Sequence, residues 1–117
     1  MKDVFCKIVD KEIPTDIIIE GENWIAFEDI NPDAPVHYLV VPKKHYEYLE
    51  QVDDANLLGE LMQAATKVAE KTGVMEKGFR VVINQKSDGG QVVPHLHLHV
   101  LGGKKLATRM SNQEGGK

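Results

Sequence analysis

The spacing of hydrophobic residues changes along the chain, and these changes predict two helical segments. Residues 4–9 carry apolar side chains at helical spacing, which predicts a short amphipathic helix that ends before Pro14. Residues 54–72 repeat leucine, alanine and valine every three to four positions, which predicts the main helix. Gly73 follows directly and suits the left-handed conformation that ends many helices.

The rest of the ordered chain consists of short runs rich in β-branched, aromatic and aliphatic residues, separated by glycine, proline and asparagine. These runs predict strands over residues 17–20, 24–29, 36–41, 79–84 and from 92 or 93 to 101. The order of the elements predicts one α+β domain. We expect an antiparallel five-stranded meander sheet with one main helix over a face and a short N-terminal helix.

The last of these runs contains three histidines, His95, His97 and His99, which alternate with aliphatic residues. Neighbouring residues of a strand point to opposite faces, so this spacing predicts three imidazoles on one face and core residues on the other. Because histidine titrates near physiological pH, an aligned set of three indicates a functional site.

Three kinds of role fit such a row. The histidines can be hydrogen-bonded structural residues, or they can chelate zinc or copper with His37 or Cys6 as further ligands, although a straight row closes poorly around one ion. The third role is nucleophilic catalysis at phosphorus, in which one ring nitrogen attacks while the other donates to a carbonyl. The turn at residues 89–91 favours this role, because its backbone N–H groups can bind phosphoryl oxygens.

Composition excludes several other classes of protein. The chain has 117 residues, of which 42% are hydrophobic and 27% charged, a balance typical of one globular domain. A net charge of −4 argues against a broad nucleic-acid-binding surface, and no apolar run is long enough to span a membrane. The single cysteine and the lack of an apolar N-terminal segment lead us to expect a cytoplasmic protein.

The sequence His95-Leu96-His97-Leu98-His99-Val100-Leu101 resembles the motif of the histidine triad (HIT) family. The opening residues 5–9, the loop 29–37, Asn84 and the glycine turn are also similar to that family. The run Leu101-Gly102-Gly103 resembles its HINT branch, the nucleoside phosphoramidate hydrolases. The resemblance implies a HIT-like fold in a domain over residues 1–103. We expect residues 104–117 to be a tail that is partly disordered or at a dimer interface.

The resemblance also implies a function and a set of roles. It implies a homodimer that binds a purine nucleoside monophosphate or its phosphoramidate, without a metal or cofactor. His97 is the expected nucleophile and forms a nucleotidyl-histidine intermediate, His99 contacts the phosphate oxygens, and His95 and His37 order the neighbouring hydrogen bonds. The expected nucleotide-binding residues are Val4, Phe5, Ile8, Phe27, Asp29, Ile30, Asn84, Gly90, Gln91 and Val92.

Some of these residues have structural explanations as well. Asp29 can cap a loop, Asn84 is common beside turns, and Phe5 can belong to the core. The resemblance gives His45 no catalytic role, and Cys6 alone cannot make the cysteine-based zinc site of some relatives.

Two features differ from the HINT pattern. Val92 stands where many members have a serine that assists the leaving amine, and the tail lacks a tryptophan-proline segment. The histidine motif, the glycine turn and the family resemblance nevertheless lead us to expect phosphoramidate hydrolysis by His97. The alternatives are dinucleoside polyphosphate hydrolysis on the same fold and nucleotide binding without catalysis.

Overall fold

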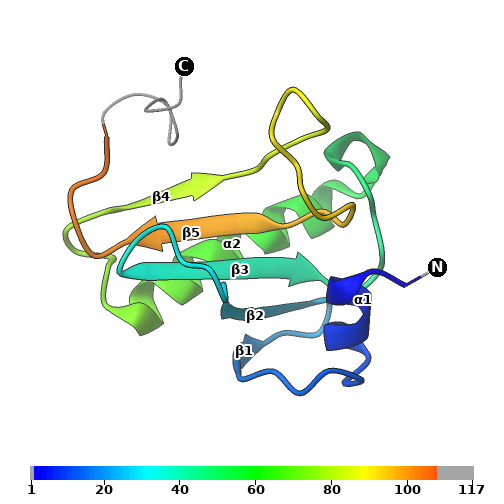
Figure 1. The fold of residues 1–117 in the computed structure, drawn as a ribbon, viewed down its shortest axis with the longest axis horizontal. Coiled ribbons are helices and arrows are strands. Elements are labelled where there is room, and N and C mark those ends of the chain that lie inside the picture. The colour runs from blue at the N-terminus through cyan, green and yellow to red at the C-terminus, as the bar shows by residue number, and fades with distance from the viewer. Residues whose placement is uncertain (1, 108–117) are drawn as a thin grey trace.

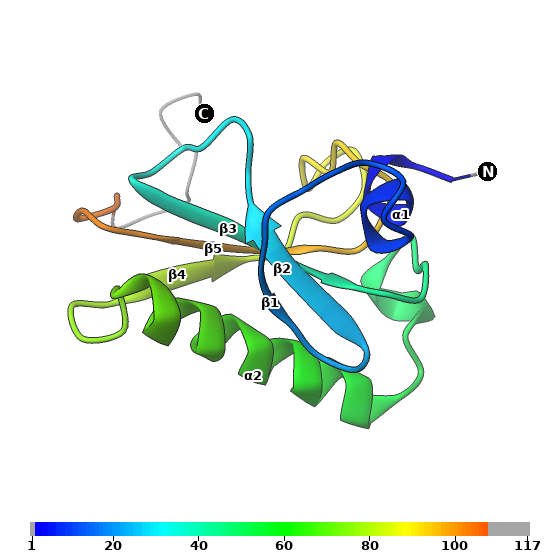
Figure 2. The same ribbon diagram turned by 90° about the horizontal axis from the view of Figure 1, so that it is seen from below.

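Two helices lie on opposite faces of a five-stranded antiparallel sheet in a computed structural model of the chain, which describes residues 2–107 (Figures 1 and 2). The elements in chain order are α1 (Val4–Val9), β1 (Ile17–Glu20), β2 (Trp24–Glu28), β3 (Val36–Pro42), the 3-10 helix η1 (Leu49–Gln51), α2 (Ala55–Thr72), β4 (Phe79–Val82) and β5 (Leu98–Gly102). This arrangement confirms the predicted α+β class with one main helix and a short N-terminal helix.

The strand order is β1-β2-β3-β5-β4, so only the first three strands form a meander. The last strand enters the sheet between β3 and β4 and pairs antiparallel with both. In this position Leu98 and Val100 of β5 are fully buried, whereas every residue of β4 is half-buried. This difference in burial follows from the strand order, because β5 has a partner strand on both sides whereas β4 forms the edge.

The two faces of the sheet bury separate hydrophobic clusters. On one face, Ala26, Val40 and Val100 pack against the apolar side of α2, including Leu61 and Val68. The opposite face carries Ile25, Phe27, Leu39 and Val41, which pack against Phe5 and Ile8 of α1. Figures 1 and 2 show that the short α1 covers only part of this second face, beside the C-terminal end of β3 and the adjoining end of β2. The remainder of that face is open to ligands.

The ends of α2 follow the sequence signals. Asp54 accepts hydrogen bonds from the N–H groups of Asn56 and Leu57, and Gly73 adopts the left-handed conformation with φ of 83°. An aspartate at the N-cap satisfies backbone donors that the first turn leaves unpaired. The helix therefore begins and ends where the pattern predicts.

The last strand is shorter than predicted. It begins at Leu98 rather than at residue 92 or 93, so His95 and His97 precede it. Pro94 lacks a backbone N–H, and the N–H groups of His95 and Leu96 donate to the carbonyls of Val93 and Tyr46 instead of to a sheet partner. The prediction of one regular strand through all three histidines is therefore wrong. Phe5 nevertheless contacts the rings of both His95 and His97, and the ring centroids of His97 and His99 lie 4.9 Å apart.

The fourth strand is also shorter, because it ends at Val82 and Asn84 lies in the following loop. Of the predicted tail, residues 104–107 follow β5 at one end of the sheet, and residues 108–117 lie outside the described part of the chain. Between residues 2 and 107, no helix has the length and apolar character needed to cross a membrane.

Candidate active site

A cleft of about 910 Å³ lies between α1 and the sheet face that carries His97 and His99. Most of the residues predicted for the site line it: Val4, Phe5, Ile8, Phe27, Asp29, Ile30, His37, Asn84, Gly90, Val92, His97 and His99. Two do not, namely His95 and Gln91. Leu39 and Asp33 also line the cleft, and sequence patterns did not indicate a role for them.

His97 has one ring nitrogen committed to the backbone. Its Nδ1 lies 2.6 Å from the carbonyl oxygen of His95, and only 6% of the residue is exposed. A carbonyl can only accept, so Nδ1 carries the proton and Nε2 keeps its lone pair. Burial lowers the pKa of His97, which favours the neutral ring. The result is a neutral imidazole whose Nε2 lone pair makes no hydrogen bond within the described part of the chain.

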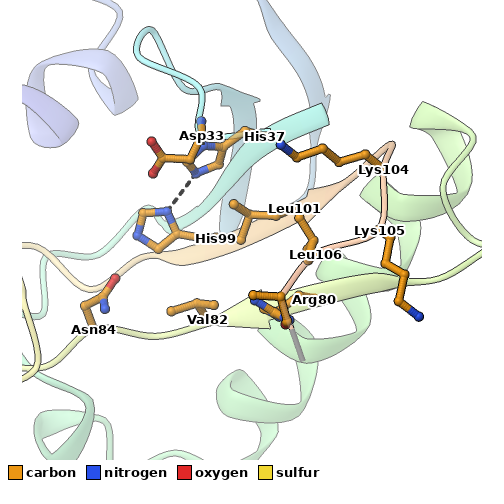
Figure 3. A pocket seen from close by; sticks show the side chains of 11 residues that line it. Asp33, His37, Arg80, Val82, Asn84, His99, Leu101, Lys104, Lys105 and Leu106 are labelled. Carbon is orange, nitrogen blue, oxygen red and sulfur yellow. Dashed lines mark hydrogen bonds between the residues drawn. The ribbon is translucent and has the colours of Figure 1, made fainter. Parts of the chain in front are cut away.

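His99 accepts a hydrogen bond from His37. The backbone N–H of Asp33 donates to Nδ1 of His37 over 3.0 Å, so a neutral His37 has its proton on Nε2. That Nε2 lies 2.9 Å from Nδ1 of His99, as drawn in Figure 3. Burial, followed by the nearby His97 and His37, lowers the pKa of His99 to about 4. A neutral His99 accepting at Nδ1 therefore presents Nε2–H as a donor.

The glycine turn beside these histidines needs glycine for two reasons. A Cβ at Gly89 would lie 2.2 Å from the carbonyl oxygen of Gln85, and Gly90 has φ of 81°. Asn84 holds the turn by donating its side-chain amide to the carbonyl of Gly89 over 2.8 Å. The turn thus brings Gly90 and Asn84 to the cleft beside His99.

Gln91 stabilises this turn through hydrogen bonds of its side-chain amide. Its side-chain oxygen accepts from the N–H of Lys86, and its amide donates to the carbonyl of Glu47, both at 2.8 Å. This explains why Gln91 does not line the cleft. Its place in the site is that of a support for the turn.

The apolar wall of the cleft comes from α1 and β2. Phe5 packs edge-on against Phe27 with ring centroids 5.7 Å apart, and against His97 at 5.1 Å. Phe5 is therefore both a core residue and a cleft residue, as both interpretations of the sequence require. At the rim, Ile30 and Val92 are 91% and 90% exposed. Such large exposed apolar side chains around a cleft are typical of a ligand-binding rim.

Asp29 lies at the end of β2 and has two local partners. One carboxylate oxygen accepts from the N–H of Asn31 over 2.9 Å, which is the loop-capping role considered from the sequence. The other lies 3.5 Å from Nε2 of His37. Asp29 also lines the cleft, so its acceptor oxygens remain available to a ligand hydroxyl.

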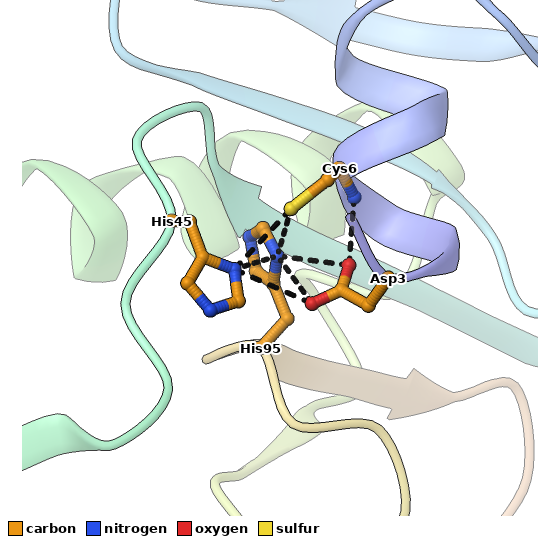
Figure 4. A group of neighbouring side chains, drawn as sticks. All are labelled: Asp3, Cys6, His45 and His95. Atoms are coloured by element: carbon orange, nitrogen blue, oxygen red, sulfur yellow. Dashed lines mark hydrogen bonds and ion pairs between the residues drawn. The ribbon is translucent and has the colours of Figure 1, made fainter. Parts of the chain in front are cut away.

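His95 belongs to a separate cluster with Asp3, Cys6 and His45, shown in Figure 4. Its Nδ1 lies 3.2 Å from both carboxylate oxygens of Asp3 and 3.1 Å from Nδ1 of His45. The thiol of Cys6 lies 3.5 Å from the same nitrogen, while Nε2 faces the carbonyl of Pro42. No sequence signal linked Asp3 and His45 to His95, because these contacts join distant segments of the chain.

Two groups of described residues could hold a metal ion, because their ligand atoms lie within 4.8 Å of one another. They are Asp3 with Cys6, His45 and His95, and Asp29 with His37 and His99. The first offers four donors of the types that zinc accepts, whereas two members of the second are already joined by a hydrogen bond. The expected absence of a metal stays a prediction.

Comparison with known proteins gives consistent matches. The family model described as HIT domain matches residues 10–106. The chain is 37% identical to the purine nucleoside phosphoramidase of Escherichia coli (strain K12), with 94% of each chain covered. Its structure is similar to that of a HIT family hydrolase from Legionella pneumophila, with a TM-score of 0.87, 43% identity, and 92% and 97% of the two chains covered. A histidine triad protein from Clostridium difficile has a TM-score of 0.86 and 43% identity, with 94% and 100% covered.

Proposed function

Because the chain belongs to the HIT domain family, we propose that it hydrolyses purine nucleoside 5′-phosphoramidates with His97 as the nucleophile. The observation that carries this proposal is the hydrogen bond from Nδ1 of His97 to the carbonyl of His95. It leaves the Nε2 lone pair on a buried, neutral imidazole at the cleft. A neutral imidazole with one fixed tautomer is the form needed for attack on phosphorus.

In the first step, Nε2 of His97 forms a bond to the α-phosphorus as the bond from phosphorus to the amine nitrogen breaks. The leaving nitrogen takes up a proton from solvent, because Val92, at the position where many family members have a serine, has no hydroxyl that could donate one. The negative charge on the phosphoryl oxygens is stabilised by the Nε2–H donor of His99, by the Asn84 amide and by the Gly90 backbone. These three groups line the same cleft as His97.

In the second step, water attacks the phosphorus of the nucleotidyl-histidine, and the bond from phosphorus to Nε2 breaks. The products are the nucleoside monophosphate, with one water proton released, and the regenerated neutral imidazole. Throughout, the base lies between Phe5, Ile8 and Phe27, and the ribose hydroxyls donate to Asp29. Apolar walls with a few placed polar groups are typical of small-molecule sites. The E. coli relative's name is consistent with this substrate class.

We also propose that the working form is a homodimer. The sheet has two edges, β1 and β4, and an edge strand with unpaired backbone groups can pair with a second copy. Sedimentation velocity over a range of concentrations measures the state directly. A species of twice the chain mass is expected, and a monomer throughout the range would exclude this part of the proposal.

The central experiment combines turnover with intact-protein mass. Wild type and His97→Ala are incubated briefly with an adenosine 5′-phosphoramidate of a fluorogenic amine. Wild type is expected to release the amine and to show a transient mass increase of one adenylyl group, and His97→Ala neither. Unchanged turnover in His97→Ala would refute the assignment. Binding of AMP by wild type without adduct or turnover would instead identify a nucleotide-binding module.

A further inference from the structure

A second pocket of about 590 Å³ adjoins the nucleotide cleft on the side of residues 104–107, and we call it the tail-side pocket. The two share four lining residues, Asp33, His37, Asn84 and His99. His97 lines only the cleft, and Arg80, Lys104 and Lys105 line only the tail-side pocket. His99 and Asn84, the expected phosphate contacts, therefore belong to both hollows. Figure 3 shows the two residues in the lining of the tail-side pocket.

The register of the sheet explains how Arg80 reaches this place. His37 pairs with Leu101, which pairs in turn with Arg80, while His99 pairs with Val82. Directly paired residues of antiparallel strands point to the same face, so Arg80 shares the face of His37 and His99. α1 packs against β2 and β3 and does not line this part of the face, where the tail-side pocket lies.

The tail-side pocket is strongly basic within an acidic protein. Three cationic side chains line it, Arg80, Lys104 and Lys105, against one carboxylate, Asp33. In the described part of the chain, none of the three forms an ion pair, although Arg80 donates to the carbonyl of Ala107. Figure 3 shows Lys104 extended towards His37, while Lys105 points away from it. The chain as a whole carries a net charge of −4, so the positive charge of the tail-side pocket is local and does not reflect the overall composition.

Resting on the proposed function, we infer that the tail-side pocket receives the leaving group and selects leaving groups that carry negative charge. In-line displacement at phosphorus places the leaving atom opposite the attacking atom. The nucleoside occupies the hydrophobic cleft, and His97 attacks from that cleft. His97, His99 and Leu101 follow one another along the chain into β5, and the tail-side pocket is lined by His99 and Leu101 but not by His97. The pocket therefore lies beyond His99 as seen from His97, and a leaving group opposite His97 is directed towards it. There Lys104 and Arg80 attract an anion, and Lys105 adds to the local potential.

Two kinds of leaving group have this chemistry. An amine that bears a carboxylate, such as an amino acid joined through its nitrogen, places one negative charge in the pocket. A phosphate chain places several negative charges in the same pocket. Both would be recognised by the same cationic side chains, since guanidinium and ammonium groups bind carboxylates and phosphates alike.

The test compares two substrates that differ only in charge, adenosine 5′-phosphoramidates of glycine and of glycinamide. Wild type is expected to prefer the carboxylate by roughly fivefold in kcat/KM at low salt, as for a nearby but solvated charge. Lys104→Gln is expected to remove most of this preference, and higher ionic strength should reduce it. Lys44→Gln is the matched control, because Lys44 belongs to the loop after β3 and lines neither hollow. A diadenosine triphosphate, as a third substrate, distinguishes a phosphate chain from a carboxylate.

Equal kcat/KM for glycine and glycinamide leaving groups in wild type would overturn the inference while leaving the phosphoramidase proposal intact. So would a preference that Lys104→Gln, Lys105→Gln and Arg80→Gln all leave unchanged. If wild type turns over neither substrate, the proposed function fails separately. The dissociation constants of the two compounds for His97→Ala then decide the inference, since tighter binding of the glycine compound supports it and equal binding overturns it.

Discussion

Nε2 of His37 lies 2.9 Å from Nδ1 of His99, and this contact decides which nitrogen of His99 carries the proton. The direction follows from the other end of His37, where Nδ1 already accepts from the N–H of Asp33. His37 is only 1% exposed, and its Nε2 lies nearer to His99 than to the carboxylate of Asp29, which is 3.5 Å away. Under the proposed function, His37 therefore acts on the phosphate through the protonation of His99.

Replacing His37 tests this relationship. We expect His37→Leu to lower kcat by about a hundredfold, because His99 loses the donor that holds its Nε2–H towards the phosphate. His37→Gln, which offers an amide N–H at a similar place, should recover part of the rate. The KM for the phosphoramidate should change less than kcat in both variants. Equal losses in the two variants, with lowered thermal stability, would indicate a purely structural residue.

The pH dependence of the reaction follows from the buried histidines. Burial lowers the pKa of His97 below its usual 6.5, and His99 reaches about 4. A lowered pKa keeps the nucleophilic neutral ring present as the pH falls. We therefore expect kcat/KM to stay level through pH 6.5 and to decline only at lower pH. A profile measured from pH 4 to 8 that already declines above pH 6.5 would contradict a neutral His97 in the free protein.

Asp29 provides a prediction about the sugar. If its carboxylate accepts from the ribose hydroxyls, wild type should prefer a ribonucleoside phosphoramidate over the 2′-deoxy compound by about tenfold in kcat/KM. Asp29→Ala should bring the ratio close to one. Asp29→Asn keeps a side-chain oxygen that can accept from the N–H of Asn31, so the loop is preserved while the negative charge beside the sugar is lost. An intermediate ribose-to-deoxyribose ratio is therefore expected for this variant. A ratio unaffected by Asp29→Ala would leave Asp29 as a loop cap only.

Asp3 and Asp54 form a matched pair of helix caps. Asp3 accepts from the N–H of Cys6 at the start of α1, and Asp54 caps α2 in the same manner. Either residue changed to alanine should lower the free energy of unfolding by about 1 kcal/mol, measured in urea. Only Asp3→Ala should also weaken AMP binding, because Asp3 connects α1, the wall of the cleft, to His95. Equal AMP affinity in both variants would mean that the position of α1 does not depend on Asp3.

The local elements were largely predictable from the sequence, because they depend on spacing within a few residues. The apolar repeat over residues 54–72, an aspartate before it and Gly73 after it place α2 correctly. The alternation around His99 predicted a β-strand, and in the structure His99 lies in β5 and lines the cleft. Where the prediction of the last strand was wrong, at His95 and His97, the competing signal was Pro94, which removes a backbone donor from the ladder.

The sequence by itself determined the fold class, the two helices, and the presence of a histidine site beside a glycine turn, since periodicity and turn chemistry are local properties. Only the tertiary structure decided that β5 lies between β3 and β4, because strand order depends on pairing between segments that are far apart along the chain. The same is true of the His37–His99 hydrogen bond, the cluster of Asp3 with His95, and the position of Arg80 near Lys104. These contacts join residues far apart along the chain, and only the packing of the sheet against its two helices brings them within reach.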